Sequence, residues 1–244
     1  MANQFGLIGY PLGHSFSKKY FSDKFKKSQS SDSYELYELI AIDELADLLK
    51  STHLKGLNVT IPYKQQVIPF LHTLDRSANL VGAVNVIKVK ENELIGYNTD
   101  YPAFRSSLKK WLDHTNIKAL VLGTGGASKA VIAALNDLKI QYQQVSRTQT
   151  STNITYEELA SNNKWIQEFE LIINTTPLGM APNFNNQPDI PYQRLTSKHC
   201  LYDLVYNPLE TRFLASGRQS GCKTKNGIEM LELQAELAWD IWHA

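Results

Sequence analysis

Several features that would place the chain quickly in a class of protein are scarce or missing. Only two cysteines occur, Cys200 and Cys222, and neither stands in a C-x-x-C or cysteine–histidine spacing that holds metals. The histidines form no ligand spacing either. We therefore predict no metal site, and inert thiols in a reducing compartment.

Long apolar runs and an excess of one charge are also missing. No stretch approaches the ~18 apolar residues that a membrane-spanning helix needs, and the first residues do not resemble a signal peptide. Lys and Arg number 25, Asp and Glu 24, and they are scattered, which is not typical of nucleic-acid or membrane binding. We expect a soluble cytoplasmic protein, a monomer or homodimer, that binds a small molecule.

The composition that remains is that of an ordinary globular protein. Hydrophobic residues make up 43% and charged residues 20%, which excludes global disorder. A chain of 244 residues can form one large domain or two modest ones, each with its own core.

The first hundred residues alternate short apolar runs with amphipathic stretches. We predict strands over 5–8, 34–39 and 57–60, helices over 19–27 and 42–51, a helical turn over 65–68 that ends at Pro69, and a hairpin of 84–89 with 93–97 around the polar residues 90–92. Strands that alternate with helices favour an α/β domain with a mostly parallel sheet covered on both faces.

A second unit begins near Asp100. We predict helices over 103–111 and 128–138 and strands over 119–122, 140–145, 171–174 and 201–204. This is a series of βαβ units, typical of a Rossmann-type domain. The last segment, 228–242, has an apolar helical stripe, and we expect it to pack on the first domain. The expected division is 1–100 with the helix 228–244, and 101–227.

A glycine-rich turn joins the first strand and second helix of this second unit. It reads Gly123-Thr124-Gly125-Gly126, and the small residue Ser128 takes the third glycine position of a G-x-G-x-x-G pattern. Gly123 permits a tight turn, Gly125 lets the backbone approach a pyrophosphate, and the helix N-terminus supplies amides. The alternative is a structural turn of another α/β fold, but the strand before it and the helix after it favour a dinucleotide site.

The end of the following strand indicates which dinucleotide. A site that prefers NAD carries an acidic residue about 20 residues after the first glycine, to bind the ribose. There the chain has Ser146-Arg147-Thr148 and no carboxylate. Unless Arg147 is simply a surface residue, it can stack on adenine and pair with a 2′-phosphate, so we predict NADP.

Polar strings that a core does not need follow the strands of the first unit. They are GYPLGHSFS at 9–17, NVTIPYK at 58–64, GAVN at 82–85 and GYNTD at 96–100. Hydroxyls, amides, one ammonium and one carboxylate at strand ends suit a small polyhydroxylated acid.

With NTTPLGM at 174–180, YDLVYNP at 202–208 and GIEML at 227–231, these strings resemble the shikimate dehydrogenase family, in the family's order and across essentially the whole chain. The resemblance implies a substrate domain joined to a Rossmann-type NADP domain. It implies NADPH-dependent, reversible reduction of 3-dehydroshikimate to shikimate, in the pathway to chorismate and the aromatic amino acids.

The resemblance also assigns residues to roles. It implies catalytic Lys64 and Asp100, and substrate contacts from Ser15, Ser17, Thr60, Asn85, Tyr206 and Gln234. It implies cofactor contacts from Gly123, Gly125, Gly126, Ala127, Ser146, Arg147, Thr148, Thr176, Gly227 and Met230. A Lys beside the ketone oxygen can donate the proton that reduction requires, or stabilise the developing charge as an ammonium. Both roles stay open.

Two positions depart from the family's pattern. Lys18 stands where relatives usually have proline, although Ser17 can still cap the helix. After Arg147 the residues Gln149, Thr150 and Ser151 are neutral where a second basic residue is common. We therefore expect a preference for NADP that is modest.

The residues fit other functions less well. A quinate/shikimate dehydrogenase using NAD is disfavoured by the missing acidic residue near Arg147. A non-catalytic ligand sensor on the same fold could dispense with Lys64 and Asp100, yet both are present. A Ser–His nucleophile at His14 and Ser15 lacks an acid spaced to orient it.

Overall fold

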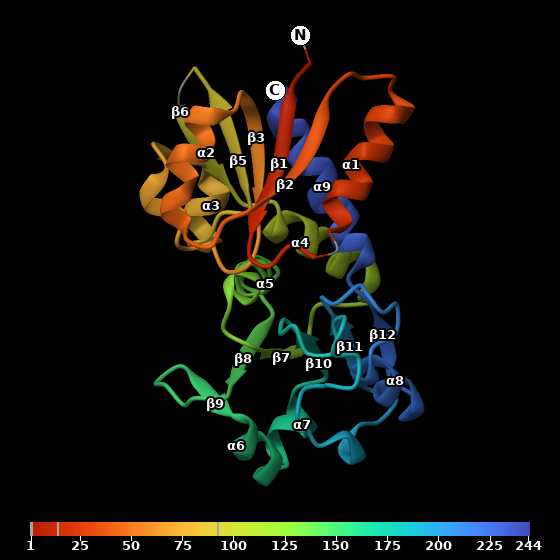
Figure 1. The fold of residues 1–244 in the computed structure, drawn as a ribbon. Helices are drawn as coiled ribbons and strands as arrows, with labels where there is room; N and C mark the ends of the chain where they lie inside the picture. Colours follow the sequence, from red (N-terminus) through yellow and green to blue (C-terminus); the bar gives the residue numbers. More distant parts are fainter. Residues whose placement is uncertain (1, 14, 92) are drawn as a thin grey trace. The chain divides into compact units, whose positions relative to one another are not determined.

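The structure is a computed structural model and describes residues 2–13, 15–91 and 93–244. The chain divides into two compact units. Unit 1 comprises Met1–Thr99 and Gln234–Ala244, and unit 2 comprises Asp100–Leu233. The long C-terminal helix therefore begins among residues of unit 2 and ends among residues of unit 1 (Figure 1).

Unit 1 is built on a six-stranded sheet of order β2-β1-β3-β5-β6-β4. The strands are β1 (Gln4–Gly9), β2 (Ser33–Glu38), β3 (Leu54–Val59), β4 (Thr73–Leu74), β5 (Val86–Lys90) and β6 (Glu93–Tyr97). Strand β1 runs parallel to β2 and β3, whereas β5 is antiparallel to β3 and β6. The predicted hairpin is thus present, and it makes this sheet mixed.

Helices cover both faces of this sheet because successive side chains of each strand point to opposite sides. They are α1 (Phe16–Lys27), α2 (Leu45–Ser51), α3 (Arg76–Val81) and α9 (Ile228–His243), with short 3-10 turns η1 (Ile42–Glu44) and η2 (Ile68–Phe70). On β1, Phe5 packs in a cluster with α1 and α9, and Ile8 packs in a cluster with α2 and α3. Figure 1 shows these two pairs of helices on opposite sides of the strands.

Unit 2 contains a second six-stranded sheet, of order β12-β11-β10-β7-β8-β9, in which every pair is parallel. The strands are β7 (Lys118–Leu122), β8 (Gln141–Ser146), β9 (Asn153–Thr155), β10 (Leu171–Asn174), β11 (Cys200–Asp203) and β12 (Lys223–Lys225). The order places β7 and β10 side by side, with β8 beyond β7. This is the doubly wound arrangement in which ligands bind outside the carboxyl ends of the strands.

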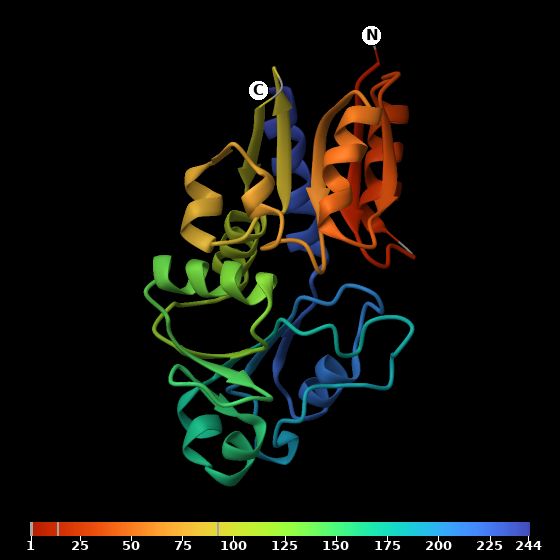
Figure 2. The same cartoon turned by 60° about the vertical axis from the view of Figure 1, so that its left-hand side comes forward.

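The sheet of unit 2 is also covered on both faces. Its helices are α4 (Asp100–Trp111), α5 (Gly126–Asp137), α6 (Tyr156–Ser161), α7 (Lys164–Glu168) and α8 (Arg212–Gln219), with a 3-10 turn η3 (Tyr192–Arg194). Leu159, Ile166 and Phe213 of α6, α7 and α8 share one core cluster with the strands. On the other face, Phe104 of α4 packs edge-on against Tyr202. Figure 2 shows α5 on one side of these strands and α6 and α7 on the other.

The fold class expected from the sequence is confirmed, and most predicted elements are present within a few residues. One local prediction is wrong: Pro69 does not end a helical turn but lies inside η2, at a first-turn position where its missing N–H costs nothing. The elements that the sequence did not predict are short: α3, β4, β9, α6, α7, α8 and β12.

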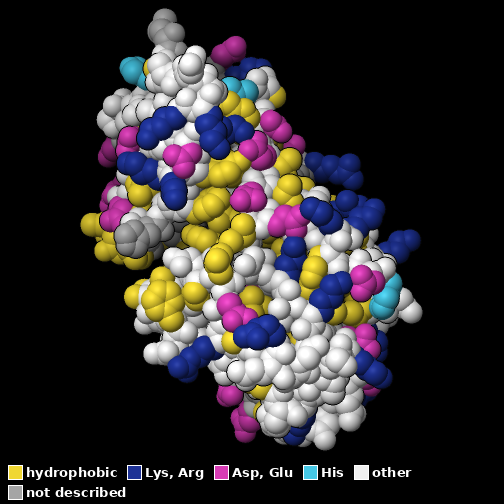
Figure 3. All heavy atoms as spheres, turned by 90° about the vertical axis from the view of Figure 1, so that its right-hand side faces the viewer, with side chains coloured by type: hydrophobic (Ala, Val, Ile, Leu, Met, Phe, Trp, Pro, Cys, Tyr) yellow, Lys and Arg dark blue, Asp and Glu magenta, His cyan; other side chains and the backbone are white. Residues whose placement is uncertain are grey.

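Charged side chains are mixed in sign over the surface. On the face drawn in Figure 3, basic side chains are interspersed with acidic ones rather than gathered in one patch. Exposed ion pairs such as Lys18–Glu35 contribute to this mixing. Within the described residues, no helix is long and apolar enough to cross a membrane.

Candidate active site

In unit 1, Ser15 and Ser17 lie where the loop after β1 enters α1. Ser15 has extended backbone and its side chain accepts a hydrogen bond from the Lys18 amide at 3.4 Å, so Ser15 is the N-cap. The sequence interpretation that Ser17 caps the helix is therefore wrong. Ser17 lies in the first turn and hydrogen-bonds the side chain of Tyr34. Both serines are half-buried.

Asn85 lies directly before β5 and is anchored by hydrogen bonds to two other residues. Its side chain is 3% exposed. Asn85 Nδ2 donates to Thr99 Oγ1 at 2.8 Å, and its Oδ1 accepts from the Thr99 amide at 2.7 Å. Nδ2 also lies 3.5 Å from Gln234 Oε1, at the point where α9 enters unit 1. Two predicted residues far apart in sequence, Asn85 and Gln234, are thus brought together.

Beneath Asn85 lies a polar pair that the sequence interpretation did not single out. Tyr34 Oη donates to Asn58 Oδ1 at 2.6 Å, and Asn58 Nδ2 donates to the Asn85 carbonyl at 3.4 Å. Burial raises the pKa of Tyr34, so its hydroxyl stays a neutral donor. The signal was available, because Asn58 is a polar residue between the apolar Leu57 and Val59. Through the hydrogen bond from Asn58, this pair helps to hold the backbone of Asn85 in place.

Thr60 and Lys64 follow directly after β3. The Thr60 amide donates to the Ile8 carbonyl at 2.9 Å, and the Lys64 carbonyl accepts from the Val84 amide at 2.7 Å. A Cβ on Gly9 would lie 2.4 Å from the Thr60 methyl, so this glycine permits the close approach. The backbone is therefore fixed at both ends of the string that carries the half-buried Lys64.

Two further predicted residues belong to unit 2. Asp100 is the first residue of α4 and is only 6% exposed. Tyr206 is half-buried in the segment that follows β11. The roles of Lys64, Asp100 and the predicted substrate residues stay predictions.

The glycine-rich turn of unit 2 has the geometry that the sequence pattern requires. Gly123 has φ of +112°, in the left-handed region that favours glycine, and a Cβ there would lie 2.8 Å from Thr175 Oγ1. Gln144 Nε2 donates to the Gly123 carbonyl at 2.8 Å. Gln144, on the neighbouring strand β8, was not predicted as part of the site, yet it holds the turn in place.

Gly125 is the N-cap of α5 and has no side chain to accept from the amides of the first turn. No atom lies within 4 Å of the position that its Cβ would take. Its small size therefore leaves open space beside the partly exposed Gly126 and Ala127 rather than avoiding a protein neighbour. An open space at the amino end of a helix fits a dinucleotide pyrophosphate.

Arg147 is the first residue after β8 and is exposed, as is Thr148, whose amide donates to Ser146 Oγ at 3.3 Å. Burial raises the pKa of Tyr156 to about 12, and the positive charge of Arg147 acts in the opposite direction. The guanidinium is therefore close to Tyr156 while open to solvent. This arrangement fits a 2′-phosphate ligand.

Gly227 and Met230 lie at the start of α9. A Cβ on Gly227 would lie 2.2 Å from the Leu204 carbonyl oxygen, and the Gly227 amide donates to the Val205 carbonyl at 3.2 Å. Glycine is thus required here by a close backbone approach to the segment after β11. Met230 is 7% exposed.

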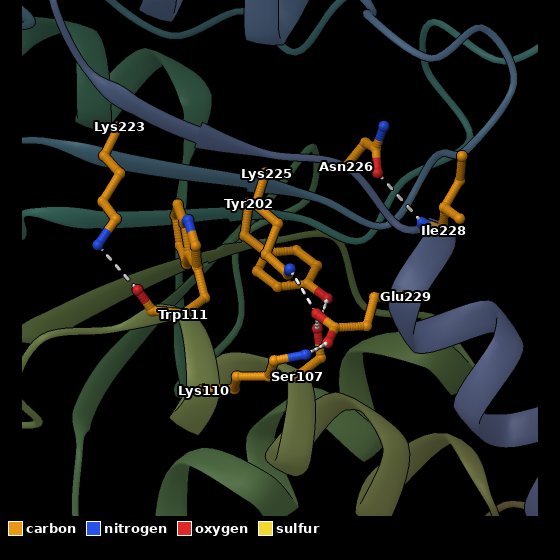
Figure 4. A network of polar contacts seen from close by, with 9 residues as sticks. All are labelled: Ser107, Lys110, Trp111, Tyr202, Lys223, Lys225, Asn226, Ile228 and Glu229. Carbon is orange, nitrogen blue, oxygen red and sulfur yellow. Dashed lines mark hydrogen bonds and ion pairs between the residues drawn. The ribbon is translucent and has the colours of Figure 1, made fainter.

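Between them, Glu229 forms the network of Figure 4. Its carboxylate pairs with Lys110 Nζ at 2.8 Å and with Lys225 Nζ at 2.6 Å, and accepts from Ser107 Oγ at 3.0 Å. Ser107 Oγ is also 2.9 Å from Tyr202 Oη. The hydrogen bonds from Lys110 and Lys225 lower the pKa of Glu229 to about 2. The network fixes the first turn of α9 to α4 and to β11 and β12.

Two further predictions from the sequence concern a metal site and a Ser–His nucleophile. Over residues 2–13, 15–91 and 93–244, no group of three or more His, Cys, Asp or Glu is placed to hold a metal ion. The Ser–His alternative involves His14, which lies outside the described residues.

These features define a class. A parallel sheet that carries an open glycine turn at a helix N-terminus, followed by an exposed arginine after the next strand, is the dinucleotide-binding unit of an NADP-dependent α/β oxidoreductase. Residues 7–87 match the shikimate dehydrogenase substrate binding domain family. The chain is 38% identical to the NADP-dependent shikimate dehydrogenase of Clostridium beijerinckii over 98% of this chain and 91% of that protein.

Solved structures agree with the sequence comparison. Shikimate dehydrogenase 1 of Peptoclostridium difficile superposes with a TM-score of 0.88 at 35% identity and covers 99% of this chain and 92% of its own. The Thermus thermophilus shikimate 5-dehydrogenase, solved with NADP(H) and shikimate, gives a TM-score of 0.86 at 29% identity over 98% of this chain and 93% of its own. The chain belongs to the shikimate dehydrogenase family.

Proposed function

We propose that the protein is an NADP-dependent shikimate dehydrogenase, which reversibly reduces 3-dehydroshikimate to shikimate in the pathway to chorismate and the aromatic amino acids. The observation that carries this proposal is the anchored Asn85 amide, held by Thr99 and Gln234 beside the strings that bear Ser15, Ser17 and Lys64. Uncharged donors and acceptors fixed in place select a ligand with matching hydroxyl groups, because a ligand without them would leave these groups unpaired.

The side chains of unit 1 bind and orient the substrate. The half-buried hydroxyls of Ser15 and Ser17 bind its carboxylate, since both are hydrogen-bond donors at the beginning of a helix. Asn85, Thr60 and Gln234 bind the ring hydroxyls. The backbone hydrogen bonds at both ends of the Thr60–Lys64 string keep these groups in one geometry, which lowers the entropy cost of binding.

Lys64 acts on the oxygen that changes during the reaction. Bound NADPH supplies the hydride, and the ketone oxygen becomes an alcohol. Lys64 stabilises the negative charge that develops on that oxygen and donates a proton to it. Asp100, which is 6% exposed, is the second residue that we assign to this proton transfer. In the reverse direction the same groups remove the proton from shikimate.

The residues of unit 2 hold the dinucleotide. Amides of Gly125, Gly126 and Ala127 bind the pyrophosphate, and Arg147 binds the 2′-phosphate, assisted by Ser146 and Thr148. Thr176, Gly227 and Met230 complete the site. We further propose that the protein works in the cytoplasm as a monomer or homodimer, without nucleic-acid or membrane partners.

The function is tested by mixing the protein with NADP and shikimate and following the near-ultraviolet absorbance of reduced nicotinamide. We expect turnover with shikimate and NADP, and less with NAD. Turnover of quinate with NAD at equal or higher kcat/KM would replace the proposal by a quinate/shikimate dehydrogenase. Binding of shikimate without turnover under any cofactor would indicate a ligand sensor instead.

A further inference from the structure

A fully buried carboxylate lies at the carboxyl edge of the unit 2 sheet and has no role in the function proposed above. Asp203 ends β11, and Asn174 ends the neighbouring strand β10, where the two residues are paired in register. Both have 0% exposure. A buried carboxylate that water cannot reach must accept hydrogen bonds from protein donors. The donors around Asp203 therefore show which parts of the chain it holds.

Three donors from three segments converge on this carboxylate. Asp203 Oδ1 accepts from Asn174 Nδ2 at 2.9 Å and from the Val205 amide at 3.0 Å, and Oδ2 accepts from Thr211 Oγ1 at 2.5 Å. Burial raises the pKa of Asp203 to about 6, so the carboxylate is ionised at neutral pH and acts purely as an acceptor. We call Asp203 with these three partners the Asp203 hub.

The hub fixes which way the Asn174 amide faces. Because Nδ2 donates to Asp203 at 2.9 Å, and also to the Leu178 carbonyl at 3.4 Å, Oδ1 is turned to the other side. There it accepts from the Thr176 amide at 3.0 Å and from Thr176 Oγ1 at 2.6 Å. A Cβ on Gly123 would lie 2.8 Å from Thr175 Oγ1 and 3.0 Å from the Thr176 methyl. The chain of contacts therefore runs from Asp203 through Asn174 to Thr176, and ends on the glycine turn.

The hub is a poor device for stability alone. A buried carboxylate costs desolvation energy that a well-packed apolar group avoids, and the raised pKa of Asp203 reflects that cost. What Asp203 gives in return is direction, since its oxygens accept from three donors and so fix the orientation of the Asn174 amide. That return is useful where a ligand site needs one geometry.

We propose that Asp203 is a positioning residue for the dinucleotide: through Asn174 it holds Thr176 and the segment after β10 in the conformation that binds NADP. The inference rests on the proposed function, since it concerns the cofactor side of the same site. Asp203 itself touches no ligand. It acts by orienting one amide, which in turn orients the residue predicted to contact the cofactor.

The test measures NADPH binding directly, by fluorescence titration without substrate. Asp203→Ala and Asn174→Ala each break the chain of contacts, and we expect both to weaken NADPH binding about tenfold, the equivalent of a single hydrogen-bonded contact. In turnover assays, KM for NADP should rise while KM for shikimate changes less than twofold. The double variant should bind NADPH no more weakly than either single variant, because both act on one path.

Two matched variants separate positioning from stability. Thr211→Val removes the third donor, keeps the side-chain shape and leaves Asn174 held, so it should lower the melting temperature without weakening NADPH binding. Asp203→Asn is isosteric: its oxygen can accept from Asn174 and Val205 while its amide donates to Thr211, whose hydroxyl can rotate. It should bind NADPH within about twofold of the unchanged protein. If Asp203→Ala does not fold, Asn174→Ala against Thr211→Val carries the test.

Each outcome decides. Folded Asp203→Ala or Asn174→Ala protein that binds NADPH as the unchanged protein does would overturn the inference and leave the proposed function intact. Equal loss of binding in Thr211→Val would also overturn it, because the effect would then follow stability. If the unchanged protein itself fails to bind NADPH, the proposed function falls and the inference falls with it.

Discussion

In the function that we propose, the two units recognise their ligands with different parts of the chain. In unit 1, the predicted contacts are side chains, and the buried amide of Asn85 is anchored by Thr99 and Gln234. In unit 2, the proposed central contact is backbone: an open glycine turn with space beside Gly125, held by a hydrogen bond from Gln144. The comparison teaches that substituting a side chain in unit 1 removes a proposed substrate contact directly. In unit 2, a substitution affects the proposed cofactor contact by changing the residues that hold the backbone of the glycine turn in place.

The largest effect should come from Lys64, the side chain to which we assign the proton transfer. We expect Lys64→Ala to lower kcat by about 10³-fold while KM for shikimate changes far less, because a positioned proton donor contributes on this scale. Steady-state kinetics with NADP and shikimate measure the split. The exposed Lys55→Ala, on the same strand-and-loop segment, is the control and should leave both constants unchanged. A rise in KM with kcat preserved would make Lys64 a binding residue.

The next effect tests the backbone side of the comparison. Gly125 has φ of −77° and no atom within 4 Å of a Cβ position, so Gly125→Ala should fold with an unchanged melting temperature. The added methyl would occupy the space that we assign to the pyrophosphate, and NADPH binding should weaken roughly thirtyfold, about 2 kcal/mol. Gly227→Ala is the contrasting variant. Its Cβ would meet the Leu204 carbonyl, so it should lower the melting temperature first. Undiminished NADPH binding by Gly125→Ala would remove the backbone site.

A smaller effect is expected from Arg147, the side chain that we assign to the 2′-phosphate of NADP. Arg147→Ala should raise KM for NADP about tenfold, since a hydrogen bond to a charged group contributes about 1.5–3 kcal/mol, and should leave KM for NAD unchanged. The measurement is kcat/KM for each cofactor. Arg218→Ala, an exposed residue paired with Glu210, serves as the control. If the NADP preference survives in Arg147→Ala, another residue sets it.

The smallest effect concerns the pH dependence of stability. Two acids of unit 2, Glu229 and Asp203, have pKa values that are shifted in opposite directions. The pKa of Glu229 is lowered to about 2, so its ion pairs stabilise the fold above its ordinary pKa near 4.5 and are lost as the pH falls toward 2. Glu229→Gln should cost about 1 kcal/mol at pH 7 by urea unfolding, and the difference should shrink below pH 4.5.

Asp203 has the reverse sign. Its pKa is raised from 3.8 to about 6, so the folded state binds the proton more tightly than the unfolded chain does. The stability that this proton provides is full below pH 3.8 and is lost as the pH rises to about 6. Tyr192, which lies within electrostatic reach, stays neutral because burial raises its pKa. Asp203→Asn, compared with the unchanged protein, should therefore gain relative stability between pH 4 and pH 7. A constant difference would contradict this assignment.

The same comparison explains what could be predicted from the sequence. The glycine turn, the strand periodicity and the residues after β8 are local features of the sequence. The Rossmann-type unit, and the position of Arg147 after β8, could therefore be predicted from short stretches of the chain. The short helices α6 and α7 could not, because six or five residues give too little periodicity and their stability comes from packing in the core. Polar strings in unit 1 indicated the candidate substrate residues, but the pairing of Asn85 with Gln234 is a tertiary contact.

The supporting residues were the hardest to predict. Asn58, Gln144 and Asp203 touch other site residues rather than a ligand, and each is a polar residue in or at the end of a strand. Asn58 and Asp203 are visible in sequence as polar residues between apolar or aromatic neighbours, whereas Gln144 lies beside other glutamines of β8 and gives no such signal. Which donor or acceptor each residue meets depends on the neighbouring strand, and strand order is not a local property.

The division of unit 1 into two stretches of sequence has a consequence for biosynthesis. Trp242 Nε1 donates to the Ile87 carbonyl at 3.0 Å, and the indole packs where a side chain on Gly56 would otherwise stand. The face of the unit 1 sheet that α1 and α9 share is therefore completely covered only after the ribosome has translated unit 2. Until then the nascent chain exposes Phe5 and Phe21, which are buried with Trp242 in the finished protein. Unit 2 can fold during this interval, whereas unit 1 must wait and is the part that chaperones would meet.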